Sequence, residues 1–236
     1  MGTHKASKWK KTIKSWKIGD YIRQLSVVIL GIIVTFAGSN AITQYVESKE
    51  ITRTLQLVKD ELALNKENVR KINARIELEQ KACTYILEHR RCLEHASQDT
   101  LEIYRNIPMQ TRSFRYTKDA IELLKTSSLF QKVEPKTLVL EIIKAYSDLE
   151  MVAVNVRGYY DLKSEDIGGL RNKFDVYDKE LSESPCEYWE KLLSTQEGWN
   201  ICNFTVHNFS SPTPFRDIEI SLEETIGRLN KEYDLK

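Results

Sequence analysis

Glycine and proline are scarce, and their absence from one long stretch is the first clue to the fold. The chain of 236 residues has nine glycines and five prolines, and neither occurs between Gly38 and Pro108. These two residues are the main interrupters of helices, so this composition favours long helical segments. With 41% hydrophobic and 29% charged residues, the chain can bury a core. We therefore expect an all-α protein.

Charged residues are missing from a second stretch. No Asp, Glu, Lys or Arg occurs between Arg23 and Glu47. At ~1.5 Å per residue, this run is long enough to cross a hydrocarbon layer of ~30 Å. It predicts a transmembrane helix over residues 24–46. A cleaved signal peptide is the alternative, with Ala37-Gly38-Ser39 as the candidate cleavage site. The apolar run is long for a signal peptide, however, and no obvious N-terminus of a mature protein follows it.

Small and polar residues lie within this predicted span. Ala37 and Ala41 are spaced so that two helices could approach closely, and an Asn inside a span usually finds a neighbouring helix or water. The alternative is that Asn40 simply lies at the membrane interface. The residues predicted to support helix association are Gly31, Thr35, Ala37, Gly38, Asn40 and Ala41.

Acidic residues are nearly absent from residues 1–23, a basic juxtamembrane segment. Its periodicity predicts an amphipathic helix at the membrane interface, with a disordered tail as the alternative. The interface residues are Trp9, Lys10, Lys14, Trp16 and Lys17. Because lysine-rich flanks stay cytoplasmic, we expect a bacterial inner-membrane protein with a cytoplasmic N-terminus and a periplasmic C-terminal part.

Residues 47–107 carry a heptad pattern that predicts one long helix ending before Pro108. The seam could bind parallel copies of the chain, with Asn65 fixing the register, or it could pack on later helices of the same chain. Asn65, Glu79 and Arg90 interrupt it with polar side chains. The other seam positions are Ile51, Leu55, Val58, Leu62, Val69, Ile72, Ile76, Cys83, Ile86 and Leu93.

Residues 108–236 predict a helical bundle domain. Within it, Gly168-Gly169 is expected to break a helix that begins near Lys136. A short strand is expected over residues 201–206, and an amphipathic helix over residues 215–233.

Motifs for chemistry are few. No glycine-rich phosphate loop, nucleophile elbow or metal-ligand set occurs, so no cofactor, metal or catalytic residue is expected. Arg90 and His95 have the Arg-x4-His spacing of HEPN-type ribonucleases, which supplies an enzymatic alternative. Five residues apart, however, they do not share a helix face. Of the four cysteines, Cys186 and Cys202 could form a disulfide if the chain doubles back.

Two segments carry a resemblance. Val28-Ile-Leu-Gly-Ile-Ile-Val-Thr-Phe with Asn40, and Asp119-Ala-Ile-Glu-Leu-Leu-Lys-Thr-Ser-Ser with the segment 138–150, resemble an uncharacterised Bacteroidota family of single-span membrane proteins. The resemblance covers roughly residues 20–155. It departs from the family pattern at Ser39, Ala41 and Leu129. It implies an anchored helical domain of unknown function and supplies no catalytic residues.

These observations together lead to one functional expectation. We expect a non-enzymatic, membrane-anchored scaffold or pore-type effector, for example in antiviral or stress defence, that assembles through its span and long helix. Its partners would be the lipid bilayer, further copies of itself or an unidentified protein, and nucleic acid is not among them. The alternatives are a membrane-anchored HEPN-like ribonuclease and a monomeric tether.

Overall fold

The computed structural model describes residues 5–173 and 184–235, with side chains described from Asp20 onward. Every element in these ranges is helical, which confirms the all-α expectation. The chain divides into two compact units, Met1–Arg53 and Thr54–Lys236. The elements are α1 (Lys5–His89), η1 (Leu93–His95), α2 (Gln98–Tyr104), α3 (Asp119–Thr126), η2 (Phe130–Lys132), α4 (Lys136–Lys173), α5 (Pro185–Leu193), α6 (Gln196–His207) and α7 (Arg216–Tyr233).

The first unit contains the uncharged run, which forms part of α1. Every large apolar side chain from Leu25 to Val46 is at least 47% exposed, so no protein core covers this stretch. Among the described residues, α1 is the one helix whose length and composition would suit a membrane crossing. A signal sequence near the N-terminus would have the same character.

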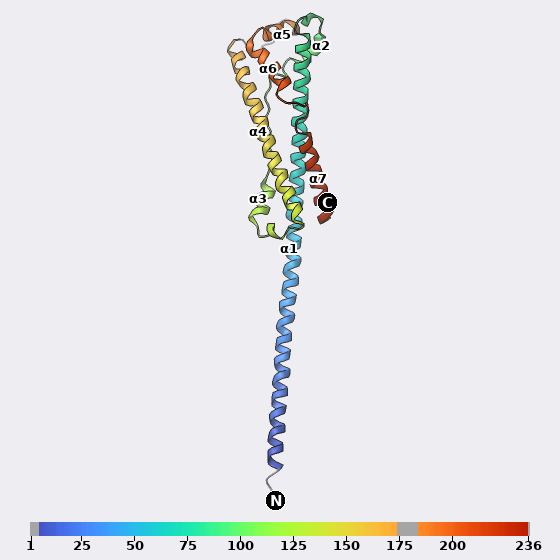
Figure 1. Cartoon of the computed structure of the whole chain (residues 1–236), viewed down its shortest axis with the longest axis vertical. Helices are drawn as coiled ribbons and strands as arrows, with labels where there is room; N and C mark the ends of the chain where they lie inside the picture. Colours follow the sequence, from blue (N-terminus) through green and yellow to red (C-terminus); the bar gives the residue numbers. More distant parts are fainter. Residues whose placement is uncertain (1–4, 174–183, 236) are drawn as a thin grey trace. The chain divides into compact units, whose positions relative to one another are not determined.

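The second unit is a bundle in which α4 lies alongside the part of α1 that belongs to this unit, residues 54–89 (Figure 1). Helix α4 also packs against α6 and α7, and α5 packs against α6 and α2. At the α5 end, a core cluster surrounds the fully buried Trp189, whose indole N–H donates to the carbonyl of Leu101. The apolar faces of α1, α4, α5 and α6 therefore bury one another.

The heptad seam of α1 faces this bundle. Every seam position from Leu55 to Ile86 is buried within the chain, and Ile51, in the first unit, is buried as well. The covered positions named above are Leu55, Val58, Leu62, Asn65, Val69, Ile72 and Ile76. A parallel stalk along this seam would therefore require the bundle to open, because the chain's own helices already occupy it.

Helix α1 ends at His89 rather than near Ile107, so the predicted boundary is wrong. Leu93 and Ala96 turn inward and join the Trp189 cluster, which a straight continuation would not allow. The next helix then begins after Ser97, whose hydroxyl accepts a hydrogen bond from the backbone N–H of Thr100. Tertiary burial and a new N-cap end the helix here without glycine or proline.

Two expectations about the bundle domain are also wrong. Helix α4 runs through Gly168-Gly169 to Lys173 without a break, and the missing side chain of Gly169 leaves room for the side chain of Glu197 on α6. A Cβ at that position would lie 3.0 Å from the Cγ of Glu197. Residues 201–206 are part of α6, where Ile201 and Cys202 join the core, and not a strand. The final helix, α7, lies within the range expected for it.

Candidate functional site: a buried charge network and a strap beside it

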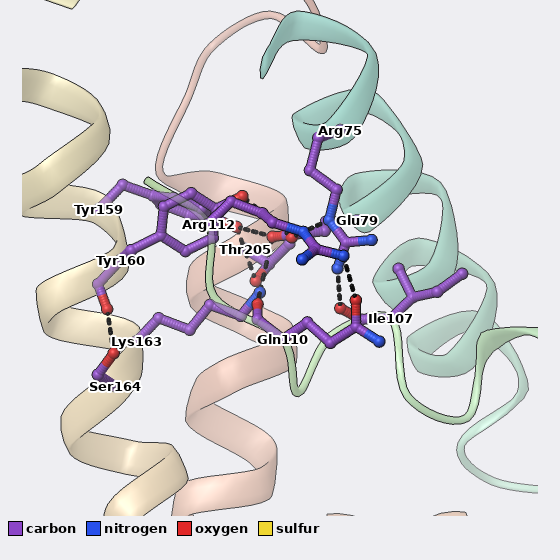
Figure 2. A network of polar contacts seen from close by, with 10 residues as sticks. All are labelled: Arg75, Glu79, Ile107, Gln110, Arg112, Tyr159, Tyr160, Lys163, Ser164 and Thr205. Carbon is purple, nitrogen blue, oxygen red and sulfur yellow. Dashed lines mark hydrogen bonds and ion pairs between the residues drawn. The ribbon is translucent and has the colours of Figure 1, made fainter. Parts of the chain in front are cut away.

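A buried carboxylate lies at the centre of the bundle. Glu79, on α1, is fully buried and accepts four hydrogen bonds (Figure 2). Lys163 Nζ donates to it at 2.6 Å, and the Tyr159 hydroxyl donates at 2.8 Å. Arg75 Nε donates at 2.6 Å and the Tyr160 hydroxyl at 3.1 Å. These four donors satisfy the buried carboxylate.

Lys163 is the second fully buried charge. Its Nζ also donates to the carbonyl of Gln110 at 3.3 Å and lies 5.6 Å from the ring centroid of Tyr159. Burial lowers the pKa of Lys163, and the nearby Glu79 opposes that shift only in part. The ammonium is therefore tolerated because of Glu79, and it would be costly to leave unpaired.

Arg75 links this network to the surface. Besides binding Glu79, it donates from its second terminal nitrogen to the carbonyl of Ile107 at 2.7 Å. Its side chain is 15% exposed, whereas those of Glu79 and Lys163 are fully buried. Two cations thus share one carboxylate, which leaves one net positive charge on the side where Arg75 reaches solvent.

The tyrosines of α4 hold their protons firmly. Burial is the main reason that the pKa values of Tyr159 and Tyr160 are raised, and the charge of Glu79 raises both further. The Tyr159 hydroxyl also contacts Thr205 Oγ1 on α6, at 3.3 Å. The network therefore ties α1, α4 and α6 together through protonated phenols.

A connecting segment, residues 107–117, runs beside α1, and we call it the strap. The amide of Asn65 clamps the backbone of Thr117, donating to its carbonyl at 2.7 Å and accepting from its N–H at 2.9 Å. Asn68 Nδ2 donates to the carbonyl of Arg115 at 3.4 Å. Together with the bond from Arg75 to Ile107, these contacts fix the strap at both ends.

A cleft opens between the strap and α1, with a volume of about 410 Å³. Four of its lining residues are basic, and no carboxylate is among the described residues that line it. Helix α1 contributes Asn68, Lys71, Ile72 and Arg75, and the strap contributes Arg112, Ser113, Phe114 and Arg115. The lining is therefore rich in hydrogen-bond donors and positive charge.

The residues predicted to support association in the membrane all lie exposed on α1. The hydroxyls of Thr35 and Thr43 donate to carbonyls one turn earlier, those of Gly31 and Ser39. Added Cβ atoms at Gly31 and Gly38 would meet nothing within 4 Å. Ala37, Asn40 and Ala41 are likewise exposed, so this surface is open along its whole length.

Arg90 and His95 have separate partners. The guanidinium of Arg90 lies over the ring of Trp199, 5.2 Å from its centroid. His95 lies in η1, and its Nδ1 is 3.1 Å from Cys92 Sγ. Helix α1 ends at His89, before both residues, so the Arg-x4-His spacing is not held on one helix.

The possible disulfide between Cys186 and Cys202 is not formed in this structure, where all four cysteines are free thiols. Cys202 shares a hydrogen bond with Cys83 of α1, and this contact, with burial, raises the pKa of the Cys202 thiol. Cys186 lies near Glu190, with its Sγ 3.5 Å from Oε1. The chain does double back, but it brings Cys202 to α1 instead.

Helix α1 also contains the predicted membrane-interface residues, whose side chains fall outside the described ones: Trp9, Lys10, Lys14, Trp16 and Lys17.

The sequence analysis missed both the charge network and the cleft. The available signal was Glu79, a charge at a seam position where an apolar residue is expected.

Comparison with known proteins adds no relative. No family model, no curated protein and no solved structure matches the chain.

Proposed function

We propose that this protein is a non-enzymatic, single-pass membrane scaffold that assembles through its apolar helical run. One observation carries the proposal: the uncharged run of α1 is exposed on all sides, while the same helix continues into a packed bundle. A soluble chain rarely exposes an apolar surface of this extent. A bilayer would cover it, and a helix is the form in which a single segment satisfies its backbone there.

The charge distribution sets the proposed orientation. The lysine-rich segment ahead of the run would stay in the cytoplasm of a bacterial cell, and the bundle would lie across the inner membrane. The resemblance to single-span Bacteroidota proteins, carried by Val28–Phe36 and Asn40, points to the same kind of anchoring.

Asn40 supports assembly within the membrane. Thr35 and Thr43 satisfy their hydroxyls within their own helix, whereas the described part of the chain offers the Asn40 amide no partner. An unpaired amide in hydrocarbon favours a neighbouring helix, and Ala37 and Ala41 would allow that helix close. A pore-type effector would be a special case of the same assembly.

The mass of the full chain in neutral detergent tests the proposal, together with a periplasmic reporter enzyme fused at Lys236. We expect an active reporter and a defined oligomer. Asn40→Leu should weaken assembly roughly 3- to 30-fold. Thr43→Val is the matched control and should leave assembly unchanged, because that hydroxyl binds its own helix. If the protein is a strict monomer, the proposed assembly is refuted and only the monomeric tether remains. An inactive reporter would overturn the proposed orientation.

A further inference from the structure

The cleft between α1 and the strap has the features of a built anion site. Its polar lining consists almost entirely of donors, with three guanidinium groups, one ammonium, the amide of Asn68 and the hydroxyl of Ser113. Guanidinium groups bind phosphate in a bidentate manner. Such a lining suits an acceptor-rich ligand that carries several negative charges.

The positive charge of the cleft is only partly neutralised by the protein itself. Arg75 binds Glu79, but Lys163 binds the same carboxylate, so the three groups together remain cationic. Arg112 contacts a neutral group, the Oε1 of Gln110, at 2.9 Å. Lys71 Nζ lies 3.9 Å from Glu67 Oε1, which is farther than either Arg75 or Lys163 lies from Glu79. The guanidinium groups of Arg112 and Arg115 are exposed, and no carboxylate of the described residues pairs with them.

The cleft is also preformed. Asn65 and Asn68 anchor the distal part of the strap to α1, and Arg75 anchors its start at Ile107. Little conformational entropy would therefore be lost in ordering the site when a ligand binds. Arg75 and Arg112, both drawn in Figure 2, line this one cleft. Two like charges that line one cleft favour an anion between them.

One wall of the cleft is apolar. Ile72 is buried beneath it, and the half-buried ring of Phe114 stacks on Tyr116, with the ring centroids 6.5 Å apart. A volume of about 410 Å³ lies within the range of small-molecule sites and exceeds what one inorganic phosphate needs. The lining thus matches phosphates on one side and a flat ring on the other.

We propose that this cleft binds a small organic polyphosphate of the nucleoside diphosphate class. The phosphates would lie on Arg75, Arg112 and Arg115, and the base would lie against Phe114. The inference concerns the second unit alone and does not depend on the membrane anchoring proposed above.

Calorimetric titration of the full chain in neutral detergent tests this, with ADP, pyrophosphate and inorganic phosphate as the probes. We expect saturable binding in that order of decreasing affinity, and weaker binding as salt is added. Replacing Phe114 by Ala should weaken ADP and leave pyrophosphate nearly unchanged. Equal affinity for all three probes would refute the assigned class.

Paired variants locate the site. The double substitution Arg112→Ala with Arg115→Ala should weaken ADP at least about ten-fold, because each removes a charge-assisted contact. The matched control is Arg91→Ala with Arg157→Ala, two exposed arginines outside the cleft whose loss lowers the net charge equally. No saturable binding up to about 1 mM, equal effects of the two doubles, or binding of an acidic peptide alone would overturn the proposal.

Discussion

Removing the charge of Glu79 should be far more damaging than removing that of Lys163, although the two form one pair. In Glu79→Gln, the ammonium of Lys163 stays fully buried without an anionic partner, because only neutral acceptors remain beside it: the new side-chain amide oxygen and the Gln110 carbonyl, 3.3 Å away. Breaking a buried pair in this way costs about 3–5 kcal/mol of unfolding free energy. For a unit of this size the midpoint of thermal unfolding should fall by roughly 6–20 °C.

Lys163→Met leaves a different situation. Glu79 keeps Arg75 at 2.6 Å and both tyrosine hydroxyls, so its charge remains paired and hydrogen-bonded. Methionine also has a similar volume. We expect a loss of only about 1–2 kcal/mol. The double variant should be more stable than Glu79→Gln alone, because the stranded ammonium is gone.

The pH dependence gives an independent check on Glu79→Gln. Burial lowers the pKa of Lys163, so between that lowered value and 10.5 the unfolded chain binds more protons than the folded one. Stability of this variant should therefore rise with pH across that window. Thermal unfolding followed by near-ultraviolet circular dichroism, on full chains in neutral detergent, measures all three variants. Equal losses in the two single variants, or a double variant no better than Glu79→Gln, would refute the reasoning.

Three further predictions concern the strap, the thiols and the tyrosines. Asn65→Ala should cost about 2–3 kcal/mol in chemical unfolding, because it removes both bonds to Thr117; a cost below that of an exposed Asn→Ala would contradict it. A maleimide should label Cys92 and Cys186 in the folded chain and all four cysteines in denaturant, as counted by mass. The contribution of three α4 tyrosines to stability should be constant below pH 10 and fall above it, with delayed tyrosinate absorbance, because their folded pKa values are raised above the unfolded value of 10.0. They are Tyr146, Tyr159 and Tyr160.

The seam of α1 could be predicted because it depends on local periodicity. Leu55, Val58 and Leu62 recur at spacings that allow packing against any partner helix, and all three are buried in the structure. The periodicity does not identify the partner, because a later helix of the same chain and a helix of another copy would both fit the same spacing. The choice between a bundle and a stalk therefore needed the positions of α4 and α7, which no local pattern supplies.

The errors have a different physical origin. The end of α1 at His89 depends on Leu93 reaching a cluster whose members on α5 and α6 lie about a hundred residues later. The pairing of Cys202 with Cys83 likewise depends on how α6 returns to α1. Gly169 was expected to break a helix, yet it serves the close approach of Glu197. Each is a contact between segments distant in the sequence, where burial outweighs the local preference.

The polar interruptions of the seam connect these observations. In a coiled coil, a buried Asn or Glu would select register between copies, at a cost in stability. Here Asn65 holds Thr117, and Glu79 holds Arg75 and Lys163, so these two interruptions hold the strap or the groups beside it. Burying them is favourable only where those partners are in place. The same side chains that make the seam a poor dimer interface therefore make it a specific support for the basic cleft.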